Sequence, residues 1–224
     1  MTQPVTEGIG SGIRTVVLVS GGGTNLQAII NEVRSGELAT NLCCVISDRP
    51  GVLGLDRADK AGIPTQVVDY QHFAQRTDAD TALLTKLSAL KADLVVLAGF
   101  MRILPEELVQ QYHGRMLNIH PSLLPKYRGL HTYRRALAAG DSHHGTTVHF
   151  VTPELDAGPS IIQYRVPIHT DETETSLSNR VQQGEYLIYP KAIRWFAEGR
   201  LRLKDNEVWL DGLPLTEPAI VNES

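Results

Sequence analysis

Short apolar runs alternate with amphipathic segments over the first half of the chain. The apolar runs are residues 15–19, 42–47, 65–68, 94–98 and 116–120, and each is typical of a strand that is buried on both faces. Apolar residues at helical spacing predict the segments between them to be helices, near residues 25–36, 55–61 and 77–90, with a short one that opens at Pro105. Asn25 is the expected N-cap of the first. This alternation predicts βαβ units and a mostly parallel sheet with helices on both faces.

The pattern changes after His120. Residues 121–133 are rich in Pro and Gly and predict a long structured loop, and two β-like runs joined by TPELDAG predict a hairpin-type connection. A helix is expected over residues 175–198, with a kink at Pro190, and a last hairpin around Asp211-Gly212. We therefore expect an α/β fold, a single Rossmann-like domain with an antiparallel addition in its C-terminal part. Its bounds would be residues 14–214, between a flexible tail (1–13) and a frayed end (215–224).

Composition narrows the possible partners. The 224 residues are 42% hydrophobic and carry 21 Lys and Arg against 25 Asp and Glu, a net charge of −4 that argues against nucleic acid as a partner. Cys43 and Cys44 are adjacent, too close for an unstrained disulfide, and are expected to be strand core residues in a reducing compartment. The first 14 residues show no apolar targeting segment, and no run reaches membrane-spanning length. We expect a cytoplasmic protein without a membrane partner.

The first candidate site is the segment SGGGTN, residues 20–25, at a predicted strand-to-helix turn. Three glycines let backbone N–H groups approach an anion, and the helix N-terminus adds positive potential. The segment lacks the Lys of a Walker A loop, and a dinucleotide fingerprint would need Gly where Leu26 stands, so a single terminal phosphate fits best. A merely tight turn is the alternative. Asp48 is either a ribose-binding acid or, as we favour, a turn residue on the surface.

The second candidate is Asn118 with His120 at the end of a predicted strand. Residues two apart on a strand point to the same face, and ligands of open α/β sheets bind beyond the strand ends. An amide beside an imidazole suits oxyanion stabilisation together with proton transfer. Asp156, in LDAGP, is a third candidate. A structural histidine and an ordinary turn aspartate are the alternatives. No metal-ligand pattern is present, and no metal is expected.

Several of these segments resemble the folate-dependent glycinamide ribonucleotide formyltransferases of purine biosynthesis. The resemblance covers residues 15–213 and rests on SGGGTNLQAII, VVLAGFMRIL, NIHPSLLPKYRGLHTYRRAL, GTTVHFVTPELDAGPSIIQ, EYLIYP and IRWFAEGRL. It implies formyl transfer from 10-formyltetrahydrofolate, as co-substrate, to the amine of 5'-phosphoribosylglycinamide in de novo purine (IMP) biosynthesis. The partners would be these small molecules, and the protein would be a monomer or a homodimer.

The resemblance also implies roles for single residues. Gly23, Thr24 and Asn25 would hold the ribonucleotide phosphate, and Glu185 would contact the same substrate. The folate site would be lined by Arg76, Met101, Arg102, Ile103, Leu104 and Asn118. Asn118 would bind the formyl oxygen, and His120 would be the proton donor. Asp156 would orient His120 and favour its protonated form.

The chain departs from this family's pattern at a few positions, and rival functions remain. Gly22 and Thr24 stand where relatives often carry Asn and Ser, and Arg128 replaces a Pro, as in methionyl-tRNA formyltransferases. The rivals within the class are that enzyme, which continues into a further domain, and formyltetrahydrofolate hydrolase, which carries an N-terminal regulatory domain. A rival of another class is a nucleotide-binding module built on SGGGTN and Asp48. It predicts that the three candidates Asn118, His120 and Asp156 do not converge.

Overall fold

In the computed structural model, which describes residues 8–223, parallel strands form the core of the first of two units. The units are Met1–Leu108 and Val109–Ser224. In the first unit the strand order is β4-β1-β2-β3, with bounds Ile13–Val19 (β1), Thr40–Ser47 (β2), Thr65–Val67 (β3) and Leu94–Leu97 (β4). The predicted runs 15–19, 42–47 and 94–98 are buried, which confirms that they are strands covered on both faces. The run 65–68 forms the edge strand β3 and is only partly buried, with Val67 37% exposed. Cys43 and Cys44 are buried free thiols on β2.

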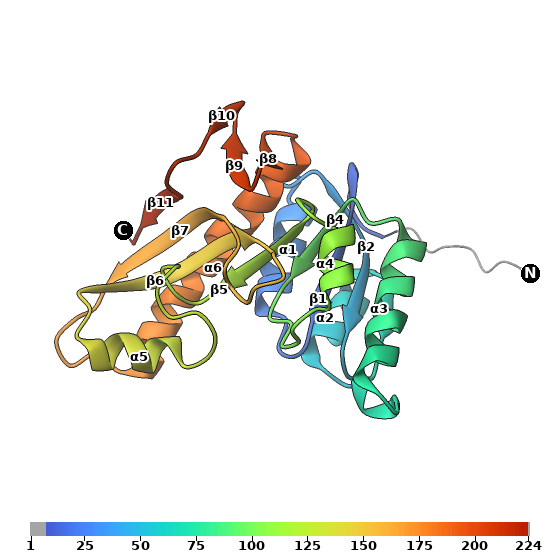
Figure 1. Ribbon diagram of the computed structural model, residues 1–224, viewed down its shortest axis with the longest axis horizontal. Helices are drawn as coiled ribbons and strands as arrows, with labels where there is room; N and C mark the ends of the chain where they lie inside the picture. Colours follow the sequence, from blue (N-terminus) through green and yellow to red (C-terminus); the bar gives the residue numbers. More distant parts are fainter. Residues whose placement is uncertain (1–7, 224) are drawn as a thin grey trace, which may run out of the picture. The chain divides into compact units, whose positions relative to one another are not determined.

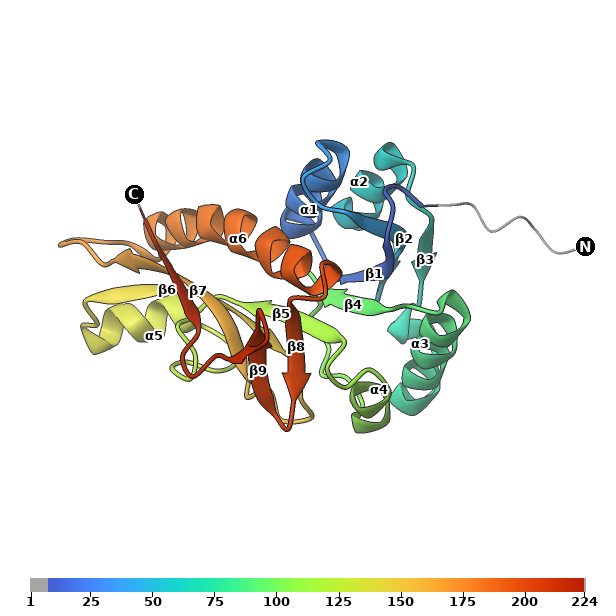
Figure 2. The ribbon, with the colours of Figure 1, turned by 90° about the horizontal axis from the view of Figure 1, so that it is seen from above.

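Helices cover both faces of this parallel sheet. They are α1 (Thr24–Arg34), α2 (Leu53–Ala61) and α3 (Arg76–Leu90), with a 3-10 turn at Tyr70–His72 and a short α4 (Glu106–Gln111) at the boundary of the units. Figure 2 shows α1 and α2 on one face of the strands and α3 on the other. The predicted cap at Asn25 is wrong: Gly23 is the N-cap, at φ 68°, and Asn25 lies inside α1. The reason is that glycine adopts this left-handed conformation at little cost.

The second unit holds the antiparallel addition that the sequence predicts. Its strands follow the order β11-β7-β6-β5, with bounds Met116–His120 (β5), His143–Phe150 (β6), Ser160–Pro167 (β7) and Ala219–Asn222 (β11) (Figure 1). The β5–β6 and β6–β7 pairs are antiparallel, whereas β11 lies parallel to β7. Together with the parallel sheet of the first unit, this confirms the predicted fold class: α/β and Rossmann-like, with a mostly parallel sheet.

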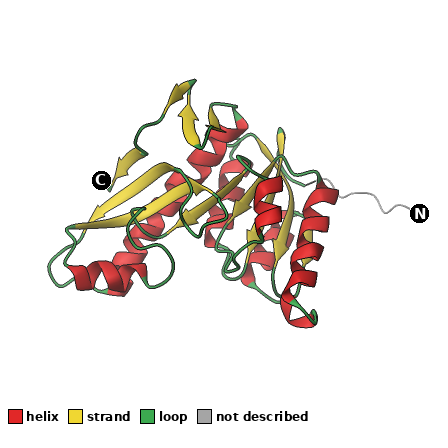
Figure 3. Ribbon diagram, in the orientation of Figure 1, coloured by secondary structure: helices red, strands yellow, loops and turns green. Residues whose placement is uncertain are grey.

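A small second sheet and two helices complete this unit (Figure 3). The small sheet is built from β8 (Leu201–Lys204), β9 (Glu207–Leu210) and β10 (Leu213–Pro214), and it contains the expected hairpin at Asp211-Gly212. The helices are α5 (Thr132–Ala139), which the sequence pattern did not predict, and α6 (Glu174–Ala197). None of the helices among residues 8–223 combines the length and apolar character that a membrane span requires.

Both ends of the described chain are paired with strands. Ile9 forms a β-bridge with Leu42, so strand pairing reaches into the expected tail 1–13, of which residues 1–7 lie outside the described residues. The expectation of a frayed end over residues 215–224 is wrong, because β11 adds to the edge of β7 and Arg180 forms an ion pair with Glu223. Ser224 lies outside the described residues.

Helix α6 packs on the strands β5, β6 and β7. A capping box between Thr173 and Ser176 begins it, and the Tyr189 hydroxyl donates to the Leu117 carbonyl oxygen at 3.0 Å, which ties the helix to β5. Gly184 faces the ring of Tyr164 on β7 so closely that a Cβ there would lie 1.9 Å from Tyr164 Cδ1. The close approach of α6 to the sheet therefore depends on the missing side chain.

Gly184→Ala is expected to lower the free energy of unfolding by about 1–3 kcal/mol, because the added methyl must push the Tyr164 ring or the helix aside. Urea unfolding followed by circular dichroism measures the change. Gln183→Ala, at the exposed neighbouring position, is the matched control and should leave the midpoint unchanged. An alanine variant at Gly184 as stable as the control would contradict the packing argument.

Candidate active site

Asn118 and His120 lie on β5 and point to the same side of it, as their spacing predicts. Asn118 stands opposite His149 of the antiparallel neighbour β6, and the Asn118 Nδ2 lies 3.1 Å from His149 Nε2. The His120 side chain is only 8% exposed. The end of β5 therefore presents an amide and an imidazole in a largely buried setting.

Asp156 joins these two residues from the connection between β6 and β7. Its Oδ2 lies 3.3 Å from His120 Nδ1 and accepts the Gly129 N–H at 3.0 Å, and its Oδ1 lies 3.5 Å from Asn118 Nδ2. The backbone of Asp156 is left-handed, at φ 49°, a conformation that Asp tolerates better than most residues. The three candidates converge, and the prediction of the nucleotide-binding module that they stay apart is wrong.

Both ring nitrogens of His120 face acceptors. His120 Nε2 lies 2.9 Å from the Tyr127 carbonyl oxygen, which only accepts, so this nitrogen carries a proton. His120 Nδ1 faces the Asp156 carboxylate at 3.3 Å. The ring of His120 is therefore held in one orientation by acceptors on both sides.

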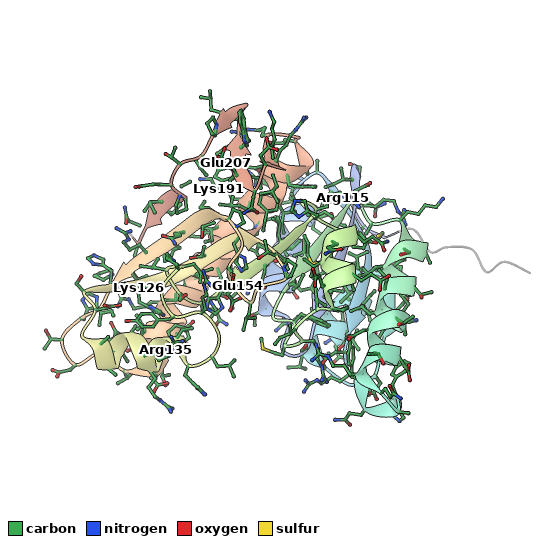
Figure 4. The ribbon with its side chains drawn as sticks, viewed as in Figure 1. Arg115, Lys126, Arg135, Glu154, Lys191 and Glu207 are labelled. Carbon is green, nitrogen blue, oxygen red and sulfur yellow. The ribbon has the colours of Figure 1, made fainter. Side chains whose placement is uncertain are left out.

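The loop that supplies the Tyr127 carbonyl is held at several points. Thr147 Oγ1 donates to the Ser122 carbonyl oxygen at 2.6 Å, and the Lys126 ammonium lies 3.0 Å from Asp141. Farther along, the Arg128 guanidinium bonds Glu154 Oε1 at 2.6 Å. Figure 4 labels Lys126 on this loop and Glu154 on the β6–β7 connection, which also carries Asp156. The contacts to His120 and Asp156 therefore belong to an ordered loop.

His149 is a site residue that the sequence analysis missed. Its Nδ1 donates to the Phe150 carbonyl oxygen at 2.9 Å, which leaves Nε2 free to accept from the Asn118 amide. Burial lowers the pKa of His149, so the ring is neutral near pH 7 and acts as an acceptor. Its signal in the sequence is a polar residue within the apolar run 146–151, which local pattern does not separate from a structural histidine.

In the first unit, the SGGGTN segment forms the turn between β1 and α1. Gly23 takes the left-handed conformation just before Thr24, the first residue of α1, and a Cβ on Gly23 would lie 2.6 Å from Gly54 Cα. Backbone N–H groups at a helix start, with no side chain over them, suit an anion. Glu185, the other residue with an expected ribonucleotide contact, lies buried on α6 in the second unit.

Asp48 is buried in the first unit, which corrects the expectation of a surface turn residue. Only 1% of it is exposed, and its Oδ2 accepts from Arg102 Nε at 2.7 Å. Burial raises the pKa of the Asp48 carboxyl, but hydrogen bonds from two arginines and a serine outweigh burial and bring the pKa below its ordinary value. Because a buried carboxylate needs such donors, Asp48 is better explained as an anchor for Arg102 than as a ribose ligand.

The expected folate residues of this unit lie on one connected network. The Arg102 guanidinium sits 4.6 Å from the centroid of the Tyr70 ring, and the Tyr70 hydroxyl donates to Asp80 at 2.8 Å. Arg76 lies beside the same Asp80 and also donates to the Ile103 carbonyl oxygen. Met101 and Ile103 are exposed, whereas Leu104 is buried. The segment 101–104 therefore presents Met101 and Ile103, while Arg76 holds its backbone and Asp48 holds the Arg102 side chain.

Comparison with known proteins shows the family of this chain. The formyl transferase family model matches residues 13–193. Phosphoribosylglycinamide formyltransferase of Haemophilus influenzae is 48% identical over 94% of this chain and 99% of its own length, and that of Escherichia coli is 50% identical over 88% and 93%. The structure of the Coxiella burnetii phosphoribosylglycinamide formyltransferase superposes with a TM-score of 0.90 at 48% identity, over 94% of this chain and 99% of that one.

These matches define the class of protein as a formyl transferase. In the structure of this chain, Asn118, His120 and Asp156 lie together at the end of β5. Nearly full-length relatives at this identity narrow the class further. The chain belongs to the phosphoribosylglycinamide formyltransferase family. Among residues 8–223 no cluster of three or more His, Cys, Asp or Glu side chains is arranged to hold a metal ion.

Asp48→Asn is expected to lower the free energy of unfolding by about 1.5–3 kcal/mol at pH 7, since it removes the charged partner of Arg102. The pKa of Asp48 is lowered in the folded state. Its contribution is therefore complete above the unfolded pKa of ~3.9 and is lost as the pH falls through the folded value.

Urea unfolding of both proteins between about pH 7 and pH 2 measures this effect, and their stabilities should converge toward the acid end. Asp56→Asn, at an exposed position of α2, is the control and should differ little from the parent protein at any pH. A constant gap between Asp48→Asn and the parent down to pH 2 would show that the Asp48 charge does not carry the effect.

Proposed function

We propose that this protein transfers the formyl group of 10-formyltetrahydrofolate to the amine of 5'-phosphoribosylglycinamide, a step of de novo purine biosynthesis. The observation that carries the proposal is the convergence of Asn118, His120 and Asp156 in a chain of the phosphoribosylglycinamide formyltransferase family. An amide donor suits stabilisation of an oxyanion, and an imidazole with a carboxylate beside it suits proton transfer, the two tasks of acyl transfer to an amine.

The reaction exchanges one carbon–nitrogen bond for another. The amine nitrogen of the ribonucleotide forms a bond to the formyl carbon, and the bond from that carbon to N10 of the folate breaks. The attacking amine loses one proton and the leaving nitrogen gains one, so atoms and charge balance. Negative charge develops on the formyl oxygen while the carbon is tetrahedral, and stabilising that oxygen lowers the barrier.

The residues of the second unit divide this work among them. The Asn118 amide donates to the formyl oxygen, and neutral His149 holds the amide in the required orientation. His120, with the Asp156 carboxylate beside its Nδ1, is the proton donor. Asp156 acts through His120 and is a positioning residue.

Other residues would bind the two substrates. The ribonucleotide phosphate would bind at Gly23, Thr24 and Asn25, where α1 begins, and Glu185 would contact the same molecule. The folate would bind along the segment 101–104, with Arg76 and Asn118. The site needs small-molecule partners only. A monomer or a homodimer is proposed, in the cytoplasm, a reducing compartment with which two buried free cysteines accord.

A formyl-transfer assay with three acceptors tests the proposal. 5'-Phosphoribosylglycinamide, initiator Met-tRNA and water are each offered to the protein with 10-formyltetrahydrofolate, and release of tetrahydrofolate is followed by absorbance. Turnover should require the ribonucleotide. Formylation of the tRNA, or release of tetrahydrofolate at the same rate without any acceptor, would overturn the proposal in favour of a methionyl-tRNA formyltransferase or a hydrolase.

Asp156→Asn is expected to lower kcat at pH 7 by roughly 10²–10⁴, the usual contribution of acid–base catalysis. Asparagine keeps an oxygen for the Gly129 N–H but removes the charge that faces His120. The ¹⁵N chemical shift of His120 Nδ1 should change as well, because the carboxylate that faces this nitrogen is gone.

Glu154→Gln is the matched control for Asp156→Asn. Glu154 lies on the same connection but is exposed and bonds Arg128, so its loss should leave kcat and the His120 shifts unchanged. Near-normal turnover in Asp156→Asn would reduce Asp156 to a turn former.

A further inference from the structure

We propose that Arg57, on α2, is a positioning residue that directs the N–H groups of the Gly-rich loop toward the ribonucleotide phosphate. This inference rests on the function proposed above and assigns a role to a residue outside the loop. Every contact that carries it lies within the first unit.

Each carbonyl of the three glycines in the loop has a donor. The Gly21 oxygen accepts the Gly54 N–H at 2.9 Å, and the Gly22 oxygen accepts Arg57 Nε at 2.8 Å. The Gly23 oxygen accepts the Gln27 N–H at 2.9 Å, which is the first bond of α1. Two of the three donors come from α2, so this helix holds the loop by its carbonyl groups.

These contacts determine where the N–H groups of the loop point. In a trans peptide the C=O and the following N–H point in opposite directions, and the only cis bond among residues 8–223 is Leu124-Pro125. The N–H groups of Gly22 and Gly23 therefore point away from α2. Within the described chain neither donates to a protein acceptor. Two aligned donors beside a helix start make an anion-binding concavity.

Arg57 is well suited to hold such a peptide. Besides Gly22, its guanidinium bonds Gln27 Oε1 at 3.1 Å, so one planar group links α2, the loop and the first turn of α1. Both acceptors are neutral, and no carboxylate of residues 8–223 forms an ion pair with Arg57, which leaves its charge beside the loop. A glycine peptide has little preference of its own, so without this bond the Gly22–Gly23 unit is free to rotate.

Loss of Arg57 should therefore weaken ribonucleotide binding and leave the folate site intact. Arg57→Met, which keeps the length of the side chain but donates no hydrogen bond, is expected to raise the KM for 5'-phosphoribosylglycinamide about tenfold or more. The KM for 10-formyltetrahydrofolate and kcat should stay within about twofold, because Arg57 touches neither substrate's reacting atoms. Arg57→Lys keeps the charge but lacks the planar guanidinium that bonds Gly22 and Gln27 together. Its KM for the ribonucleotide should remain at least about threefold above that of the parent protein.

Arg34→Met is the matched control, since Arg34 lines the same cavity between α1 and α2 but, among residues 8–223, its side chain bonds only the Lys60 carbonyl oxygen. Its ribonucleotide KM should stay within about twofold of the parent value. An Arg57→Met enzyme with an unchanged ribonucleotide KM would overturn the inference. Full recovery in Arg57→Lys would overturn it as well, because charge alone would then suffice.

Amide NMR separates failure of this inference from failure of the proposed function. Addition of 5'-phosphoribosylglycinamide to the parent protein should shift the Gly22 and Gly23 N–H signals, and Arg57→Met should move the Gly23 signal before any ligand is added. Unresponsive loop amides in the parent protein would overturn the phosphate assignment itself. Responsive amides with an unchanged Gly23 signal in the Arg57 variant would overturn only the role of Arg57.

Discussion

The Asp156 carboxylate is the group around which the polar residues of the second unit are arranged. A buried carboxylate is costly without donors, and here a backbone N–H, an imidazole and an amide surround it. Two of these donors lie on β5 and the third lies in the loop after it, whereas Asp156 itself lies on the β6–β7 connection. The need to satisfy this one charge therefore brings three parts of the chain together at the end of β5. In this arrangement the backbone of Asp156 adopts the less favourable left-handed conformation.

Two histidines of this unit show how surroundings assign different roles to one side chain. His149 is deeply buried, and burial lowers its pKa, so its ring carries one proton. That N–H donates to the Phe150 carbonyl oxygen, and the other ring nitrogen accepts from the Asn118 amide. His120 faces a carbonyl on one side and a carboxylate on the other, so acceptors hold its ring. Two histidines with different surroundings thus stand on neighbouring strands: His149 orients the Asn118 amide, and His120 is the residue that we propose as the proton donor.

In the first unit, too, polar contacts hold the binding segments in place, and there many of the groups that are held belong to the backbone. Its glycine loop is held by donors to its carbonyl oxygens, so that N–H groups remain for an anion. In the segment 101–104, Asp48 bonds the Arg102 side chain and Arg76 bonds the Ile103 carbonyl oxygen, and the side chains of Met101 and Ile103 are exposed. In both places, polar contacts hold the segment in one conformation before a ligand binds. The free energy of binding is then not reduced by the cost of ordering the segment.

Local pattern alone determined the strands of the parallel sheet, most helix bounds and the candidates Asn118 and His120, because burial on a strand or helix leaves a period in the sequence. The resemblance to a known family added Glu185, the folate residues and the roles. The tertiary structure alone decided the pairing of β11 with β7 and the burial of Asp48. It also decided the contact of His149 with the Asn118 amide and the hydrogen bond from Arg57 to the Gly22 carbonyl oxygen. Each of these joins residues far apart in the chain, and the period of a local segment carries no information about a distant partner.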